Sequence, residues 1–191
     1  MQNEIVIDRD RLEALAATDR VLTPEECAAL AHSAAALVDL AALERGGEGS
    51  FELLWRNEHS ESWLNTWWEP RDTGFHDHGG SSVGVYVLEG TARAEGLTVG
   101  GTRRIVDYRA GDSFSSPATG IHRMDHDAGA VTIHVYSPPL SVIGHYDVVD
   151  GELHRHSGAP DDISPPSPGL SAALTATATA TEIERGLDER S

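Results

Sequence analysis

The sequence contains no lysine and a single cysteine among its 191 residues. All 14 basic residues are arginines, set against 31 Asp and Glu, so the formal net charge is −17. Without lysine the chain has no nucleophile for Schiff-base or pyridoxal-phosphate chemistry and no P-loop cation. Such an acidic chain is also poorly suited to nucleic acid or an anionic membrane as its main partner. These absences exclude several large functional classes.

Cys27 is the one thiol, so the chain cannot form an internal disulfide, a dithiol redox pair or a Cys-rich zinc site. The charged N-terminus lacks the apolar core of a signal peptide, and no apolar run approaches the length of a membrane span. We therefore expect a cytoplasmic protein that binds neither membrane nor nucleic acid. Its length suits one domain of ordinary size. The oligomeric state is left open, with a monomer among the options.

The chain divides into three segments that differ in amino-acid composition. Residues 1–48 are rich in Ala and Leu, which predicts helices that cover one side of a core, and Thr23 with Glu26 has the spacing of a helix-starting capping box. Residues 49–157 alternate short β-rich stretches with Gly, Pro and Asp. Residues 158–191 begin with clustered prolines and continue as Ala/Thr repeats, for which we expect poor order.

The middle segment contains nine candidate strands separated by turn signals such as Gly100-Gly101. They are residues 51–57, 62–68, 83–88, 93–97, 103–108, 113–116, 122–125, 130–136 and 145–149. Many short strands at regular spacing predict an all-β sandwich or barrel.

Histidines with ligand-like spacing lie in this segment. His76 and His78 are two residues apart, so both imidazoles project to one face of an extended chain. His122 is the last residue of a second stretch, GDSFSSPATGIH. Together the two stretches resemble the two cupin signatures, a His-x-His pair in the first and Gly, Pro, Gly and His in the second. The resemblance implies a cupin fold, a double-stranded β-helix or jelly-roll barrel, with N-terminal α-helices.

The first cupin signature usually continues to a glutamate ligand, but here residues 79–84 read GGSSVG. A neutral set of three histidines remains. Three imidazoles suit Fe(II), Ni, Cu or Zn better than Mg or Ca, and they leave coordination positions open for a catalytic metal. Because no carboxylate adds negative charge, such a centre favours joint binding of an anionic thiolate and dioxygen.

A further motif, TIHVYSPP, places Thr132, His134 and Tyr136 on one face of a strand. His134 can then hydrogen-bond Tyr136 and direct its phenol into the barrel. Taken with HDH and PATGIH, this motif resembles the cysteine dioxygenase family of thiol dioxygenases over roughly residues 20–150.

The resemblance implies a reaction and a site. Fe(II) bound by His76, His78 and His122 would take L-cysteine through its thiolate and amine, and both atoms of O2 would go to sulfur to give cysteine sulfinate. Arg56, in LLWRNE, would pair with the substrate carboxylate. Tyr136, oriented by His134 and Thr132, would donate a hydrogen bond to the bound oxygen or substrate.

The chain departs from the family at several positions. Thr132 replaces the usual Ser, and Leu54 stands where mammalian enzymes have Tyr. The region of Val83 lacks the Cys that those enzymes link to the active-site Tyr. One alternative is another small thiol such as 3-mercaptopropionate, although Arg56 favours cysteine because relatives with that preference often have Gln there. A second alternative is a non-catalytic cupin that binds a small molecule.

The remaining histidines and the tryptophans carry no spacing argument. We expect the tryptophans to pack in the core and the barrel wall rather than to stack on substrate. The residues concerned are His59, His126, His145, His154, His156, Trp55, Trp63, Trp67 and Trp68.

Overall fold

The computed structural model of the chain describes residues 8–47, 49–97, 103–150 and 152–156. The segment 158–191, for which we predicted poor order, lies outside the described residues. Within the described part, no helix combines the length and apolar character that a membrane crossing requires.

The N-terminal segment forms helices α1 (Arg9–Ala16) and α2 (Pro24–Ala35), followed by a short 3-10 turn, η1 (Leu40–Ala42). Helix α2 starts at the predicted capping box. The Thr23 hydroxyl accepts from the amide of Glu26 at 3.3 Å, and the Glu26 carboxylate accepts from the amide of Thr23 at 2.8 Å. Two of the free amides at the helix start are thereby satisfied.

The rest of the described chain is built of short antiparallel strands. They are β1 (Ser50–Arg56), β2 (Glu61–Trp67), β3 (Arg71–Asp72), β4 (Phe75–Asp77), β5 (Ser82–Glu89), β6 (Thr91–Leu97), β7 (Arg103–Arg109), β8 (Ser113–Ser116), β9 (Ile121–His126), β10 (Ala130–Ser137), β11 (Gly144–Val149) and β12 (Glu152–Arg155). All nine predicted strands are confirmed within two residues at each end. The sequence analysis missed β3, β4 and β12, which have two to four residues each.

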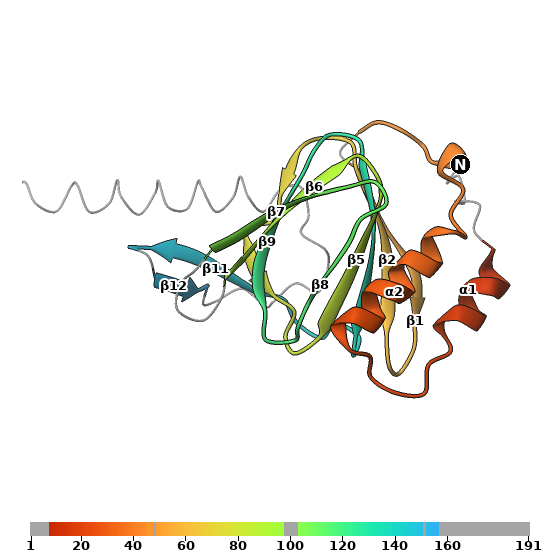
Figure 1. The fold of residues 1–191 in the computed structure, drawn as a ribbon, viewed down its shortest axis with the longest axis horizontal. Helices are drawn as coiled ribbons and strands as arrows, with labels where there is room; N and C mark the ends of the chain where they lie inside the picture. The colour runs from red at the N-terminus through yellow and green to blue at the C-terminus, as the bar shows by residue number, and fades with distance from the viewer. Residues whose placement is uncertain (1–7, 48, 98–102, 151, 157–191) are drawn as a thin grey trace, which may run out of the picture.

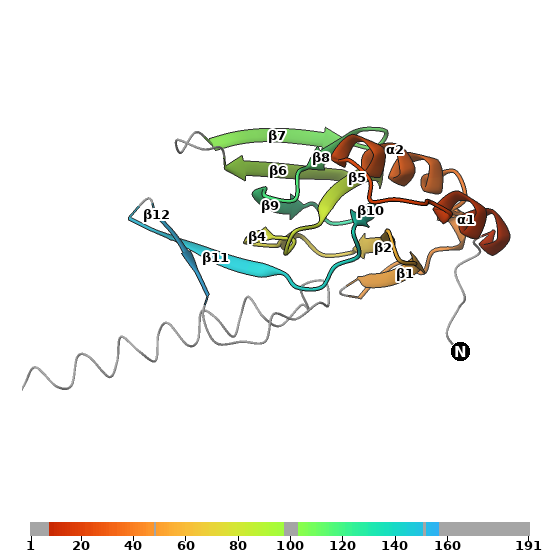
Figure 2. The same cartoon turned by 90° about the horizontal axis from the view of Figure 1, so that it is seen from below.

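The strands form two sheets that face each other (Figures 1 and 2). One has the order β1-β2-β10-β5-β8, and the other has the order β12-β11-β4-β9-β6-β7, with β3 added beside β9. Figure 1 shows both helices on the outer side of the first sheet. The predicted all-β core with N-terminal helices is confirmed.

Helix α2 packs directly on strand β5. A Cβ built on Gly84 would lie 2.0 Å from the backbone nitrogen of Ala28, so only glycine permits this approach. Cys27 and Ala31 of the helix are fully buried together with Ile133 and Val135 of β10. The helix therefore covers the outer face of the first sheet, and the inner face is left to form the site.

Candidate metal centre

The structure brings His76, His78 and His122 together. His76 lies on β4, His78 follows that strand directly, and His122 on β9 is the cross-strand partner of His76. One ring nitrogen from each residue lies within 4.8 Å of the others. Among the described residues, no other group of His, Cys, Asp or Glu has this geometry. The pairing of β4 with β9 thus brings His122, which is distant in the sequence, next to His76 and His78.

All three imidazoles are held neutral. Burial, together with the neighbouring imidazoles, lowers the pKa of His78 and of His122 well below the usual value, and burial lowers the pKa of His76 to about 4. The Nδ1 atom of His76 lies 3.0 Å from the carbonyl oxygen of Gly74. Since a carbonyl only accepts, this nitrogen carries the proton, and Nε2 of His76 keeps a lone pair. Neutral rings with free lone pairs are the form in which histidine binds metals.

The cluster has the properties of a metal site rather than of a hydrogen-bonded core. The Nδ1 atoms of His78 and His122 are buried and have no hydrogen-bond partner in the described structure. Neither ring is therefore held by a hydrogen bond at Nδ1, and each offers one nitrogen to the cluster of three that a cation could bind. Three imidazoles without a carboxylate fit a borderline transition metal. The residues present therefore fit the metal that the sequence analysis expected.

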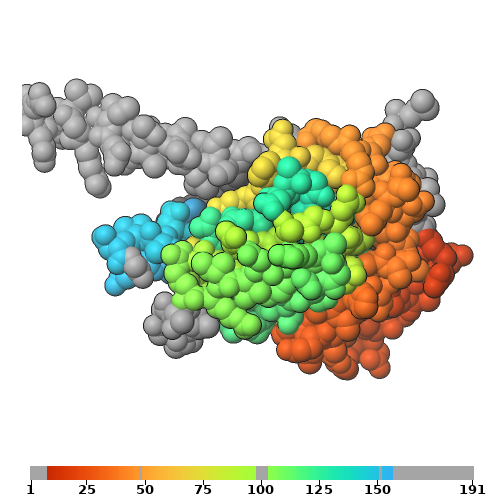
Figure 3. Space-filling model, turned by 45° about the horizontal axis from the view of Figure 1, so that its top comes forward, coloured from red at the N-terminus to blue at the C-terminus, as the bar shows by residue number. Residues whose placement is uncertain are grey.

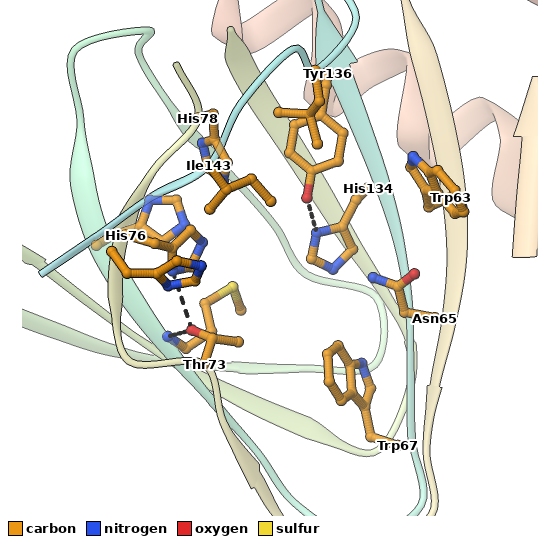
Figure 4. A pocket seen from close by; sticks show the side chains of 13 residues that line it. Trp63, Asn65, Trp67, Thr73, His76, His78, His134, Tyr136 and Ile143 are labelled. Carbon is orange, nitrogen blue, oxygen red and sulfur yellow. Dashed lines mark hydrogen bonds between the residues drawn. The ribbon is translucent and has the colours of Figure 1, made fainter. Parts of the chain in front are cut away.

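A small cavity of about 40 Å³ lies beside the three histidines. Its wall consists of Trp63, Asn65, Trp67, Thr73, His76, His78, His122, Met124, His134, Tyr136, Leu140, Ile143 and His145. Figure 4 shows His76 and His78 across this cavity from Tyr136 and His134. Most of the wall is apolar or aromatic, so the cavity suits a small ligand whose polar groups meet only a few partners.

The second group of predicted residues forms a hydrogen-bonded chain on the opposite wall. The Thr132 hydroxyl lies 3.0 Å from Nε2 of His134, and Nδ1 of His134 lies 3.2 Å from the Tyr136 hydroxyl. The indole N–H of Trp67 donates to the Thr132 hydroxyl at 3.0 Å. The predicted contact between His134 and Tyr136 is confirmed.

The donor at one end fixes only the first link of this chain. Trp67 can only donate, so Thr132 accepts from it. With the His134 proton on Nδ1, Thr132 donates to Nε2, His134 donates to the Tyr136 oxygen, and the phenolic hydrogen is free for the cavity; with the proton on Nε2, the phenol donates to Nδ1. Burial lowers the pKa of His134 to about 3, and burial with nearby Glu61 raises the pKa of Tyr136. Both side chains therefore stay in their neutral forms at neutral pH.

Several wall residues were missed by the sequence analysis. Trp63, Asn65 and Trp67 alternate along β2, and their cross-strand partners on β10 include His134 and Thr132. The spacing of two residues between them on one strand was the available signal. Trp55 and Trp68 pack in or against the core, whereas Trp63 and Trp67 lie in the barrel wall and also line the cavity.

Two histidines without a spacing argument also lie at the site. His145 lines the cavity because β11 pairs with β4, which sets it opposite His76. His126 is buried and stacks on Trp67, with ring centroids 4.0 Å apart and an interplanar angle of 11°. Trp67 donates to Thr132, so His126 supports the hydrogen-bonded chain from behind. Neither position is visible in the sequence, because each depends on strand pairing.

Arg56 lies at the edge of this arrangement. It is the cross-strand partner of Glu61, and its Nε lies 2.7 Å from Oε2 of that carboxylate. Its Nη2 donates to the carbonyl of Leu140 at 2.8 Å. The side chain of Arg56 is 43% exposed, whereas that of Glu61 is 1% exposed. Arg56 is not among the residues that line the cavity, and its guanidinium contacts Glu61 and the carbonyl of Leu140.

The sequence model of the cysteine dioxygenase type I family matches residues 41–149. This span contains both histidine motifs, the Thr132 to Tyr136 chain and Arg56. No match is found among functionally curated proteins.

Solved structures with partial similarity include KdgF from Halomonas sp., with 16% identity, 50% of this chain and 84% of that chain covered, and a TM-score of 0.41. Oxalate decarboxylase from Bacillus subtilis has 23% identity, a TM-score of 0.42, and coverage of 50% of this chain but only 26% of its own. The protein TT1209 from Thermus thermophilus has 20% identity, a TM-score of 0.44, and coverage of 53% and 95%. The assignment to a family rests on the family match alone.

Proposed function

Because the chain belongs to the cysteine dioxygenase type I family, we propose that it is an iron-dependent thiol dioxygenase that converts L-cysteine to cysteine sulfinate. The observation that carries the proposal is the pairing of three buried histidines with a hydrogen-bonded chain from Thr132 through His134 to Tyr136 on the facing wall of one cavity. A binding module has no need of a phenol held by a histidine across a cavity from a metal site.

Fe(II) held by His76, His78 and His122 would supply the redox chemistry between the thiol and dioxygen. Tyr136 would donate its phenolic hydrogen to the reacting oxygen or to the substrate. We infer that His134 carries its proton on Nδ1 and donates to the oxygen of that phenol, 3.2 Å away, so that the Tyr136 hydrogen is directed before substrate arrives. A donor held in advance stabilises developing charge without a reorganisation cost.

The apolar wall has its own part in the reaction. Leu140, Ile143 and Met124 are buried residues that line the cavity and offer no polar side-chain group to water. These apolar side chains exclude water from part of the cavity wall, which strengthens the electrostatic effect of the Tyr136 hydroxyl there. Burial raises the pKa of the Cys27 thiol to about 12, so this cysteine stays a protonated core residue. A reducing cytoplasm suits such a chain.

We also propose that Arg56 pairs with the carboxylate of the substrate, as family resemblance implies. The ion pair of Arg56 with Glu61 favours a second candidate class, small thiols without a carboxylate, because the guanidinium is engaged elsewhere. The thiol 3-mercaptopropionate has a carboxylate but no amine. It therefore separates a requirement for the substrate carboxylate from a requirement for the substrate amine.

Oxygen uptake by iron-reconstituted protein tests the proposal. L-cysteine, 3-mercaptopropionate and cysteamine are supplied in parallel, and the product is examined by mass spectrometry under labelled dioxygen. We expect a sulfinate with both new oxygen atoms from the gas. Protein that retains no iron, or iron-loaded protein that consumes no oxygen with any of these thiols, would refute the activity. His154→Ala, on the exposed strand β12, serves as a matched control for histidine variants of the site.

A further inference from the structure

Glu61 is an unusual carboxylate because its side chain is almost completely buried, with 1% exposure. Both of its oxygens contact residues near the cavity. The indole N–H of Trp63 donates to Oε1 at 3.1 Å, whereas Oε2 forms an ion pair with Nε of Arg56 at 2.7 Å, without the alignment of a hydrogen bond. A charged group at this depth needs such pairing to remain in the fold. Glu61 and Arg56 therefore form one neutral unit.

The position of this unit follows from the strand register. Arg56 on β1, Glu61 on β2 and Tyr136 on β10 are successive cross-strand partners in one row of the sheet. Partners in such a row project to the same face. Glu61 thus stands between the guanidinium and the tyrosine whose hydroxyl faces the metal histidines. In this row Glu61 lies between Arg56 and Tyr136, and only Tyr136 lines the cavity.

Arg56 also touches the cavity wall through its second contact. Its Nη2 donates to the backbone carbonyl of Leu140, and Leu140 lines the cavity. Trp63, which donates to Glu61, lines the cavity from β2 and appears beside His134 in Figure 4. The ion pair of Arg56 and Glu61 is therefore hydrogen-bonded to two residues of the cavity wall, Leu140 and Trp63.

We propose that Glu61 is a resident carboxylate that determines substrate choice: it occupies Arg56 in the empty site, and a thiol with a carboxylate binds by replacing it on the guanidinium. This inference rests on the proposed thiol dioxygenase activity. The exchange puts one carboxylate in the place of another, so the number of ion pairs to Arg56 is unchanged. It leaves Glu61 buried without its cation, however, and that cost weakens binding of every carboxylated thiol. A thiol without a carboxylate avoids this cost.

The decisive variant is Glu61→Gln, which removes the charge and keeps a carbonyl oxygen for Trp63. Binding of L-cysteine, 3-mercaptopropionate and cysteamine to iron-loaded protein is measured by calorimetry without oxygen, and KM and kcat are measured with oxygen. Dissociation constants for the two carboxylated thiols should fall about fivefold or more, while that of cysteamine changes by less than about twofold. The change should appear in KM rather than in kcat, because Glu61 acts before the chemical step.

Three further variants sharpen the test. Glu89→Gln breaks the exposed ion pair with Arg45, whose contacts are 2.7 and 2.8 Å, and controls for the loss of a Glu–Arg pair away from the site. Glu89→Gln should leave all three constants unchanged. Combining Glu61→Gln with Arg56→Met should remove the gain for the carboxylated thiols. Glu61→Met gives a second, uncharged replacement if the amide variant does not fold.

Several outcomes would overturn the inference. Glu61 variants that leave the preference among the three thiols unchanged would do so, and so would variants that shift cysteamine as much as L-cysteine, since that pattern indicates a structural role. A gain that survives the loss of Arg56 would also refute it. Failure of the proposed thiol dioxygenase activity would look different, because wild-type protein would then turn over none of the three thiols.

Discussion

The two sheets contribute different halves of the site. The metal histidines and His145 come from β4, β9 and β11 of one sheet, whereas the hydrogen-bonded chain and Glu61 come from β2 and β10 of the other. Strands β2 and β10 are buried along almost their whole length because helix α2 covers their sheet. Strands β7 and β12 of the histidine-bearing sheet are largely exposed, and Figure 3 shows β7 on the surface of the molecule.

This difference shows how each half is held in place. On the helix-covered sheet, Thr132, His134 and Tyr136 are fixed by hydrogen bonds that need no ion. On the other sheet, His78 and His122 have buried nitrogens without partners, so a bound metal would supply most of their order. Loss of the metal should therefore disturb the histidine half and leave the tyrosine half intact.

His122→Ala gives the largest expected effect. With two ligands left, the site should lose its iron, and oxygen uptake with cysteine should fall at least about a thousandfold. Metal content by elemental analysis and the rate of oxygen uptake check this directly. His154→Ala should match wild type in both measurements. Full iron occupancy in His122→Ala would contradict the proposed ligand set.

Tyr136→Phe should separate the two halves. Removal of the phenolic hydrogen leaves all three metal histidines in place, so iron content should equal that of wild type. The rate should fall by about a hundredfold, the usual range for one positioned proton donor. Iron loss in this variant would show that the two halves of the site depend on each other.

Thr132→Val tests the direction of the hydrogen-bond chain. The variant keeps the shape of the side chain but leaves the Trp67 N–H unpaired and no longer fixes the tautomer of His134. We expect a rate about tenfold lower at full iron content, with a stability loss of about 1–3 kcal/mol by chemical denaturation. Thr119→Val, at an exposed position, is the control. An unchanged rate would mean that Tyr136 is oriented without Thr132.

The smallest expected effect concerns pH and His126. Burial lowers the pKa of His126 to about 3, whereas an unfolded histidine has a pKa near 6.5. Between these values the unfolded chain binds more protons, so the stabilising contribution of neutral His126 is complete above pH 6.5 and is lost as the pH falls toward 3.

His126→Phe keeps a ring against Trp67 but cannot ionise. In metal-free protein, the decrease in unfolding free energy from pH 6 to pH 4 should therefore be smaller, by about 1 kcal/mol per pH unit. Denaturation curves at several pH values provide the measurement. Equal slopes for the variant and wild type would show that His126 is not held neutral in the fold.

The sequence could predict those features that depend on residues close together in the chain. Alternation and turn residues located the nine strands, Thr23 and Glu26 located the start of α2, and the spacing of His76 and His78 put both on one face. The contact of His134 with Tyr136 follows from their separation of two residues on a strand. Each of these features depends on neighbours in the chain.

The features that could not be predicted depend on register. Arg56 and Glu61 close the hairpin of β1 and β2, but their pairing depends on an irregularity between Leu53 and Trp55 that shifts the register. The stacking of His126 on Trp67 joins strands of different sheets. No local pattern reports such contacts, so the role of Arg56 toward substrate stays a prediction while the position of its guanidinium is known.

The close approach of α2 to β5 has a consequence for recognising relatives. Position 84 accepts no side chain while the backbone of Cys27 and Ala28 lies against it. A related barrel with any larger residue there must hold its N-terminal segment in another place or do without it. The residue that follows Val83 therefore acts as a marker in sequence comparisons, dividing barrels that can carry this helix from barrels that cannot.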